Sequence, residues 1–199
     1  MSAPDAQLIN RLFDVIEGNI VPRTREGVSA GNKLFGAAIL RKSDMSVVVA
    51  ETNNEMENPL WHGEVHALKR FYELPRGERP DPRDCIFLAT HEPCSLCLSA
   101  ITWTGFDNFY FLFSHEDSRD SFAIPHDLKI LDEVFRLKPG GYRAENAYWK
   151  SFNLRKLARE LEPLQRTFAE KRIASIEETY ADLSNAYQAS KSGNDIPLN

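Results

Sequence analysis

The chain has no long apolar run, few cysteines and no excess of positive charge. No window approaches about eighteen uninterrupted apolar residues, which excludes a transmembrane helix. The first ten residues, MSAPDAQLIN, lack the basic and apolar regions of a secretory signal, so we expect a cytoplasmic protein. The 29 Asp and Glu residues outnumber the 24 Lys and Arg residues. The resulting net charge of -5 argues against a broad nucleic-acid-binding surface.

The three cysteines are too few, and odd in number, for a disulfide framework. Cys94 and Cys97 have C-x-x-C spacing, whereas Cys85 stands alone at the start of an apolar run. In a chain without an export signal, this spacing indicates metal binding or redox chemistry. A chain of 199 residues can bury a full core without disulfides, so one domain is expected.

Apolar periodicity predicts alternating strands and helices along the chain. The expected strands are short apolar runs at 34–40, 46–51, 85–90 and 108–113. The expected helices cover 5–19, 62–74, 94–104, 126–135 and most of 144–190. The polar loops 51–59 and 75–84 separate them, because Pro, Gly and Asn cluster there.

This alternation predicts a layered α/β domain in which helices cover a mixed sheet. The first two strands are separated by RKSDM, which predicts a hairpin of antiparallel strands. The later strands are separated by helices, so we expect them to be parallel. We assign residues 1–140 to the main domain and residues 141–199 to a helical extension that packs on it.

One histidine and two cysteines supply the ligands of a tetrahedral zinc site. His62 and Cys94 each begin a predicted helix, and Cys97 follows in the first turn. Three protein ligands leave the fourth zinc position open for water, as in catalytic sites. Bound zinc lowers the pKa of that water to roughly 7. The sequence therefore predicts one Zn²⁺ ion per chain, held by His62, Cys94 and Cys97.

Glu64 lies two residues after His62, where it can face the same cavity without binding the metal. There it would take a proton from the water and pass it to the leaving group. His66 is four residues after His62 and could be a second imidazole ligand. Because the two cysteines complete the ligand set, we interpret His66 as a residue that packs beside the site.

Two other interpretations of Cys94 and Cys97 are a redox pair and one half of a structural zinc site. A redox pair does not need the upstream His62-x-Glu64, and no second C-x-x-C exists. The complete pattern H-x-E…P-C-x-x-C is the signature of zinc nucleobase deaminases. The catalytic zinc interpretation is therefore favoured.

At these residues the chain resembles the cytidine/deoxycytidylate deaminase superfamily, and within it the cytosine/guanine deaminase branch. LFGAAIL resembles that branch's P-F-G-A strand, with Leu34 in place of proline. ENPLWHGEVHAL resembles its D-P-x-x-H-A-E-V segment, with Gly63 in place of the usual alanine. EPCSLCLSAITW resembles its E-P-C-x-M-C-x-x-A-I-x-W segment. The similarity covers about residues 5 to 136, and residues 144–199 are not assigned to a family.

The resemblance implies a three-layer α/β/α cytidine deaminase-like fold with a mixed five-stranded sheet, and a homodimer. The fifth strand is expected before or after the 126–135 helix. It also implies substrate contacts at Asn53 in the loop before His62, at Gly63, at Trp103 on the pocket wall and at Asp127.

We therefore expect zinc-dependent hydrolytic deamination of a free nucleobase or related aminated heterocycle, without an organic cofactor. The AITW match and Asp127 favour a purine such as guanine, whereas Gly63 favours cytosine. One alternative is a tRNA or nucleic-acid base-editing deaminase, which needs basic residues around the pocket. The segment LPRGERPDPR offers arginines, but also acids. Another alternative is a catalytically silent zinc-binding regulatory protein, in which Glu64 would have no purpose.

Overall fold

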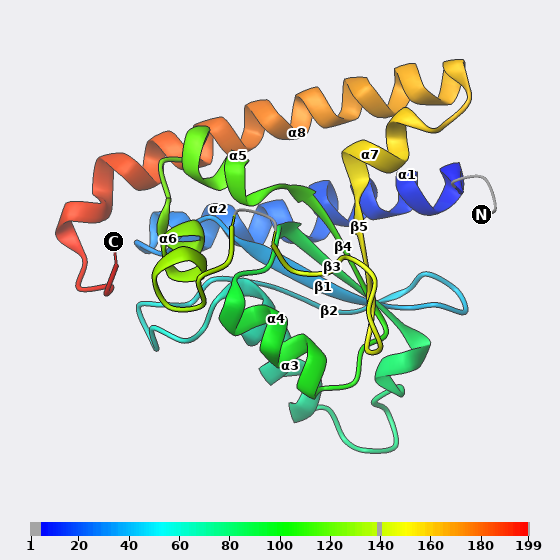
Figure 1. The fold of residues 1–199 in the computed structure, drawn as a ribbon, viewed down its shortest axis with the longest axis horizontal. Helices are drawn as coiled ribbons and strands as arrows, with labels where there is room; N and C mark the ends of the chain where they lie inside the picture. Colours follow the sequence, from blue (N-terminus) through cyan, green and yellow to red (C-terminus); the bar gives the residue numbers. More distant parts are fainter. Residues whose placement is uncertain (1–4, 139–140, 199) are drawn as a thin grey trace.

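Residues 5–138 and 141–198 are described by a computed structural model, in which helices cover both faces of one mixed sheet (Figure 1). The strands lie in the order β2-β1-β3-β4-β5. Their bounds are β1 (Gly36–Arg41), β2 (Val47–Thr52), β3 (Cys85–His91), β4 (Asn108–Phe113) and β5 (Lys150–Asn153). The prediction of a three-layer fold with a mixed five-stranded sheet is confirmed.

The strand directions follow the connections between strands. β1 and β2 form the expected antiparallel hairpin, and β3 and β4 are parallel as expected. β3 also pairs with β1 in the antiparallel direction, so β3 is the strand at which the sheet changes from antiparallel to parallel pairing. β5 is parallel to β4 and follows the 126–135 segment, within a region predicted to be mostly helical. Its four residues, KSFN, contain one apolar side chain and therefore no period-two pattern.

The helices match the predicted segments with two additions. The expected helix at 5–19 continues through a π-helical turn at Ile16–Ile20 into a further helix. A short helix after β4, not predicted, begins at a Ser114 capping box. The bounds are α1 (Ala6–Val15), α2 (Val21–Ser29), α3 (Gly63–Glu73), α4 (Ser95–Trp103), α5 (His115–Asp120), α6 (His126–Glu133), α7 (Leu154–Arg159) and α8 (Pro163–Ser190).

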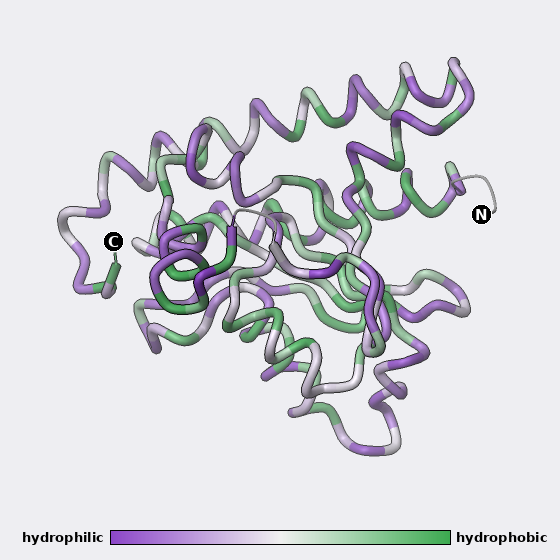
Figure 2. The backbone as a smooth tube through the Cα atoms, viewed as in Figure 1, coloured by the Kyte–Doolittle hydropathy of each residue, from purple (hydrophilic) through white to green (hydrophobic). Residues whose placement is uncertain are grey.

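Alternation along the strands divides the core between the two faces of the sheet. In β1, Ala37 and Ile39 pack with residues of α3 and α4. Ala38 and Leu40 point to the other face and pack with α1, α2, α7 and α8. The central strands are accordingly among the most apolar parts of the chain (Figure 2). This arrangement fixes the first turns of α3 and α4 beside each other on one face.

The segment after residue 140 contributes to both the sheet and the helical layers. β5 lies at the edge of the sheet, and α8 packs along α2, α7 and α1 (Figure 1). Residues 139–140, at which the two-part division was placed, lie outside the described residues, and that division stays a prediction. Within the described ranges, even the 28-residue α8 is not apolar enough to cross a bilayer.

Candidate metal centre

Two helix N-termini bring the predicted zinc ligands together. His62 is the N-cap of α3 and Cys94 is the N-cap of α4, both in an extended conformation. Cys97 lies in the first turn of α4. The positive end of a helix dipole favours thiolate over thiol at such positions. The backbone therefore places the three ligands and favours the charge state that metal binding needs.

The distances within this cluster fit a tetrahedral zinc ion. The two sulfurs, Cys94 Sγ and Cys97 Sγ, are 3.6 Å apart. His62 Nδ1 lies 3.5 Å from Cys94 Sγ and 3.7 Å from Cys97 Sγ. Standard zinc bond lengths at tetrahedral angles separate two sulfurs by about 3.8 Å and a sulfur from a nitrogen by about 3.6 Å. Among the described residues, these three are brought together as a possible metal site, with all ligand atoms within 4.8 Å.

The ligands also perturb one another's protonation. Hydrogen bonding from Cys97 outweighs burial and, with His62, holds the pKa of Cys94 well below its usual value. Burial lowers the pKa of His62, but the neighbouring Cys94 outweighs it and raises that pKa to about 9. Without metal, the site therefore favours a thiolate paired with an imidazolium. Metal binding requires neutral imidazole, so it must displace a proton from His62.

Glu64 is buried beside the ligands but is not one of them. Its Oε2 accepts a hydrogen bond of 3.4 Å from Cys97 Sγ. Burial, followed by the charge of Cys94, raises the pKa of the Glu64 carboxyl to about 7. Glu64 and the ligands line a cavity of about 10 Å³, close to the smallest volume that holds a water molecule. The Glu64 carboxylate and one water molecule can thus lie next to each other beside the position of the metal ion.

A larger cavity of about 300 Å³ lies next to the small one. Four residues line both cavities and join them: Phe35, His62, Cys94 and Asp127. This volume is at the lower end of the range for small-molecule sites, about 300–1,000 Å³. The remaining walls are mainly apolar side chains, including Pro59, Leu60, Leu96, Ile124, Ile130, Pro197 and Leu198.

Asp127 reaches the centre from the first turn of α6. Burial, and then the charge of Cys94, raise the pKa of its carboxyl to about 7. Its position at the junction of the two cavities fits a contact with a bound ring. The signal for it in the sequence was weak, because α6 lies 30 residues beyond Cys97 and is joined to α4 only through β4 and α5.

Asn53 and Gly63 bind each other rather than lining either cavity. The Gly63 backbone N–H donates to Asn53 Oδ1 at 2.6 Å, and Asn53 Nδ2 donates to Glu55 Oε2 at 2.8 Å. A Cβ on Gly63 would lie 2.7 Å from Gly36 Cα, so only glycine fits this close approach. In this structure, the two residues fix the start of α3 against β1.

Two other residues singled out in the sequence lie away from the cluster. Trp103 is at the C-terminal end of α4, is 90% exposed and lines neither cavity, so the expected contact at the pocket wall is not made within one chain. His66 does not join the ligands. Its Nδ1 lies 2.9 Å from Thr52 O, as expected for a residue that packs beside the site.

The structure adds two charged residues that sequence reasoning missed. Lys33 and Glu55 both line the larger cavity and form an ion pair. They stand 22 positions apart, before β1 and in the polar loop after β2. No local pattern marks them, because charged residues in loops are normally solvated.

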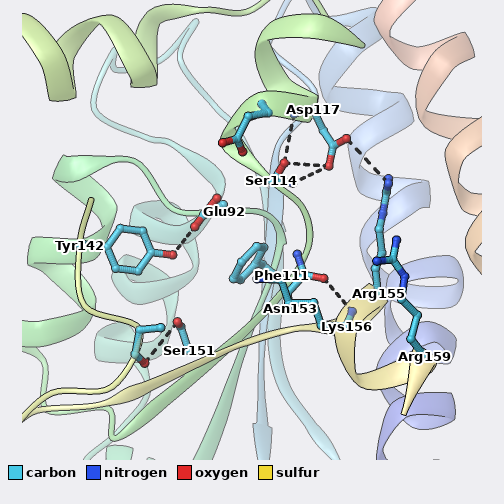
Figure 3. Close-up of a pocket in the computed structure, with 12 residues that line it drawn as sticks. Glu92, Phe111, Ser114, Asp117, Tyr142, Ser151, Asn153, Arg155, Lys156 and Arg159 are labelled. Atoms are coloured by element: carbon cyan, nitrogen blue, oxygen red, sulfur yellow. Dashed lines mark hydrogen bonds and ion pairs between the residues drawn. The ribbon is translucent and has the colours of Figure 1, made fainter. Parts of the chain in front are cut away.

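A further cavity of about 580 Å³ lies at the carboxyl ends of β4 and β5 (Figure 3). Three cations from α7 stand on one side: Arg155, Lys156 and Arg159. Acidic side chains also face it, and Asp117 pairs with Arg155 at 3.7 Å. Glu92, which accepts a hydrogen bond from Tyr142, lines both this cavity and the small one at the ligands.

Comparisons with known proteins agree with this geometry. Residues 21–113, from α2 to β4, match the family model of the cytidine and deoxycytidylate deaminase zinc-binding region. A guanine deaminase of Bacillus subtilis (strain 168) is 31% identical over 100 residues. The matched part is 48% of this chain and 61% of the relative's length.

Solved structures resemble the fold over a longer stretch. A mutant of the protein NE0047 in complex with 8-azaguanine has a TM-score of 0.54 at 17% identity, covering 89% of this chain and 84% of its own. The guanine deaminase structure from Bacillus subtilis has a TM-score of 0.45 at 28% identity, covering 55% and 73%. The first likeness supports the fold.

Proposed function

Because residues 21–113 match the family model of the cytidine and deoxycytidylate deaminase zinc-binding region, we propose that this protein is a zinc-dependent hydrolytic deaminase of a free nucleobase or related heterocycle. The observation that carries the proposal is the place of Glu64. It is a buried carboxylate outside the ligand set, in a space for one water that adjoins a base-sized cavity. A purely structural zinc site has no need of such a group.

The chain's own residues divide the work of this reaction. A zinc ion held by His62, Cys94 and Cys97 would supply an activated water at neutral pH and stabilise developing negative charge. The Glu64 carboxylate takes a proton from the attacking water and passes it to a ring nitrogen. Glu64 then takes the remaining proton of the added water and passes it to the exocyclic amine. The C–N bond breaks, a carbonyl forms, and the amine leaves as ammonia. Asn53 and Gly63 hold the start of α3, and with it Glu64, in place.

The substrate that we favour is a purine base such as guanine. Asp127 at the junction of the cavities can accept hydrogen bonds from a ring N–H and an amine. Two of the similar proteins are a guanine deaminase and a protein bound to 8-azaguanine. The negative net charge disfavours phosphate-bearing substrates. The substrate is therefore a small molecule rather than tRNA.

An ammonia-release screen tests this proposal directly. Zinc-loaded protein should release ammonia from guanine or another free base, and not from CMP or tRNA. Glu64→Gln should keep zinc and the fold but lose activity by about 10²–10⁴, the usual contribution of a general acid–base. Glu133→Gln, on the exposed surface of α6, is the matched control and should keep full activity.

Three results would contradict it. If the protein turned over CMP or tRNA but no free base, it would be a nucleotide or tRNA deaminase rather than a base deaminase. Full zinc occupancy without ammonia from any substrate would favour the silent regulatory protein. A Glu64→Gln enzyme that works at the wild-type rate would remove the assigned proton transfer.

We also propose that the protein acts as a cytoplasmic homodimer. Exposed aromatic side chains at the ends of α3 and α4 support a contact surface there, namely Tyr72 and Trp103. The Tyr72 hydroxyl donates to Thr104 O at 3.2 Å, which holds the two helix ends together. Light scattering of the wild type should give a particle mass of twice the chain mass, and the Trp103→Glu variant should give the mass of one chain. A monomeric wild type would refute the dimer.

A further inference from the structure

A buried ion pair lies beside the candidate metal centre. Lys33 Nζ is 2.8 Å from Glu55 Oε1, and the two side chains are only 8% and 1% exposed. The same Glu55 oxygen lies 3.9 Å from His62 Nε2, on the side of the ring opposite to the sulfurs. Both charged residues line the cavity of about 300 Å³. The pair therefore borders both His62 and the space for the substrate.

The Glu55 carboxylate is satisfied within the protein. Oε2 accepts hydrogen bonds from Asn53 Nδ2 at 2.8 Å and from the Lys33 backbone N–H at 3.3 Å. Oε1 accepts from Lys33 Nζ. These three contacts fix the carboxylate, and through it the position of the ammonium.

The Lys33 ammonium is not satisfied in the same way. An ammonium has three N–H donors, and among the described residues only Glu55 accepts from this one. Burying a charged group with unmade hydrogen bonds is costly, so the remaining donors need acceptors within the cavity. The charge also acts across the cavity, because burial and then Lys33 lower the pKa of His126 on α6. Nothing in the proton transfer by Glu64 requires such a cation.

We infer that Lys33 is a specificity-determining residue that donates a hydrogen bond to an oxo group on the substrate ring. The inference rests on the proposed function and narrows it to aminated heterocycles that carry an oxo group. Asp127 lines the same cavity and accepts hydrogen bonds, so the two residues together select a ring with both a carbonyl and an N–H. A ring without the oxo group would leave the ammonium with N–H donors that have no acceptor, and such unmade hydrogen bonds are what make polar sites selective.

Matched pairs of substrates test the inference. Guanine and 2-aminopurine share the ring and the amine but differ in the oxo group, as do cytosine and 4-aminopyrimidine. Lys33→Met should lower kcat/KM by about 10- to 100-fold on the oxo member, the range for a hydrogen bond to a charged group. The rate on the other member should change by less than about threefold, within the scatter of single contacts. 6-Thioguanine keeps the ring N–H but offers a weak acceptor, so it should behave like the member without oxygen.

Two further variants separate recognition from folding. Lys33→Met leaves Glu55 buried without its cation, whereas Lys33→Met/Glu55→Gln removes both charges and should fold with zinc bound. Lys42→Met is the control, because that lysine is exposed and pairs with Asp107 away from the cavity. The double variant should show the same selective loss as Lys33→Met.

Equal losses on both members of a pair, or no loss on either, would overturn the inference and leave Lys33 as a structural partner of Glu55. That result would leave the deaminase proposal intact. If zinc-loaded wild type released ammonia from no heterocycle, the proposed function would fail separately. Equilibrium binding of guanine and 2-aminopurine to wild type and Lys33→Met would then decide the role of Lys33. Equal binding of both ligands by both proteins would reject it.

Discussion

Replacing Gly63 by alanine should disturb the metal centre more than the fold. A Cβ at this position would lie 2.7 Å from Gly36 Cα, 2.8 Å from Phe35 O and 2.9 Å from Gly36 N. All three are backbone atoms of β1 and its approach, so no side chain can rotate away. The start of α3 must move away from the sheet. His62 and Glu64, on either side of Gly63, would move with it.

The size of the effect follows from two opposing terms. Overpacking of this kind costs about 1–3 kcal/mol. Alanine regains up to about 1 kcal/mol over glycine in a helix. A net loss of about 1–2 kcal/mol should lower the unfolding midpoint by about 2–8 °C for a chain of this length. Zinc affinity should fall by about 10- to 100-fold, as when residues that orient metal ligands are changed.

Thermal unfolding and zinc titration of the purified variant measure both quantities. Gly18→Ala is the control, because a Cβ at Gly18 meets nothing within 4 Å and the residue lies in a helical segment. It should leave zinc affinity unchanged and keep or raise the midpoint. If Gly63→Ala matched wild type in both measurements, the close approach of α3 and β1 would not be what orients His62.

Three further outcomes are expected. Cys97→Ala should lose tightly bound zinc in metal analysis, whereas His66→Ala should retain it, because His66 lies outside the ligand cluster; the reverse pattern would reject the ligand set. In chelated protein, the pKa of the Asp127 carboxyl is 3.8 in the unfolded chain and about 7 in the folded chain. The protonated carboxyl therefore stabilises the fold fully below pH 3.8, and this stabilisation is lost as pH rises to about 7. Asp127→Asn should therefore flatten the decline of the unfolding free energy between about pH 4 and 7, and an unchanged slope would contradict the burial of this carboxyl. Adding zinc to chelated protein should raise its unfolding midpoint as zinc concentration rises, and Glu64→Gln should show the same rise, because Glu64 is not a ligand.

Local sequence patterns predicted the parts of the site that are set by local structure. His62, Glu64, Cys94 and Cys97 lie at helix starts, where spacing alone determines which side chains can share a cavity. Sheet order and the antiparallel pairing of β3 with β1 depend on contacts between distant segments, which no short pattern contains. The four residues of β5, KSFN, do not alternate between apolar and polar side chains, so the sequence does not distinguish this strand from the helices around it.

Side chains whose surroundings are tertiary were harder to predict. Trp103 follows the motif by only a few residues, yet α4 carries it away from the cavity and into solvent. The burial of Lys33 and Glu55 could not be predicted from the sequence, because charged loop residues are normally exposed. The family resemblance, rather than a local pattern, predicted Asp127 as a substrate contact. Its burial depends on how α6 packs against α4 and α5.

The pairing of β5 with β4 has a consequence for the behaviour of shortened chains. β4 is the strand NFYFLF, an aromatic run without charge, and β5 covers the side of it that does not face β3. A protein cut before Lys150 would expose that side as an open edge with unpaired N–H and C=O groups. Such an edge recruits other strands. β5 replaces this long aromatic edge by a shorter and less apolar one, KSFN, which is less prone to pair with other chains.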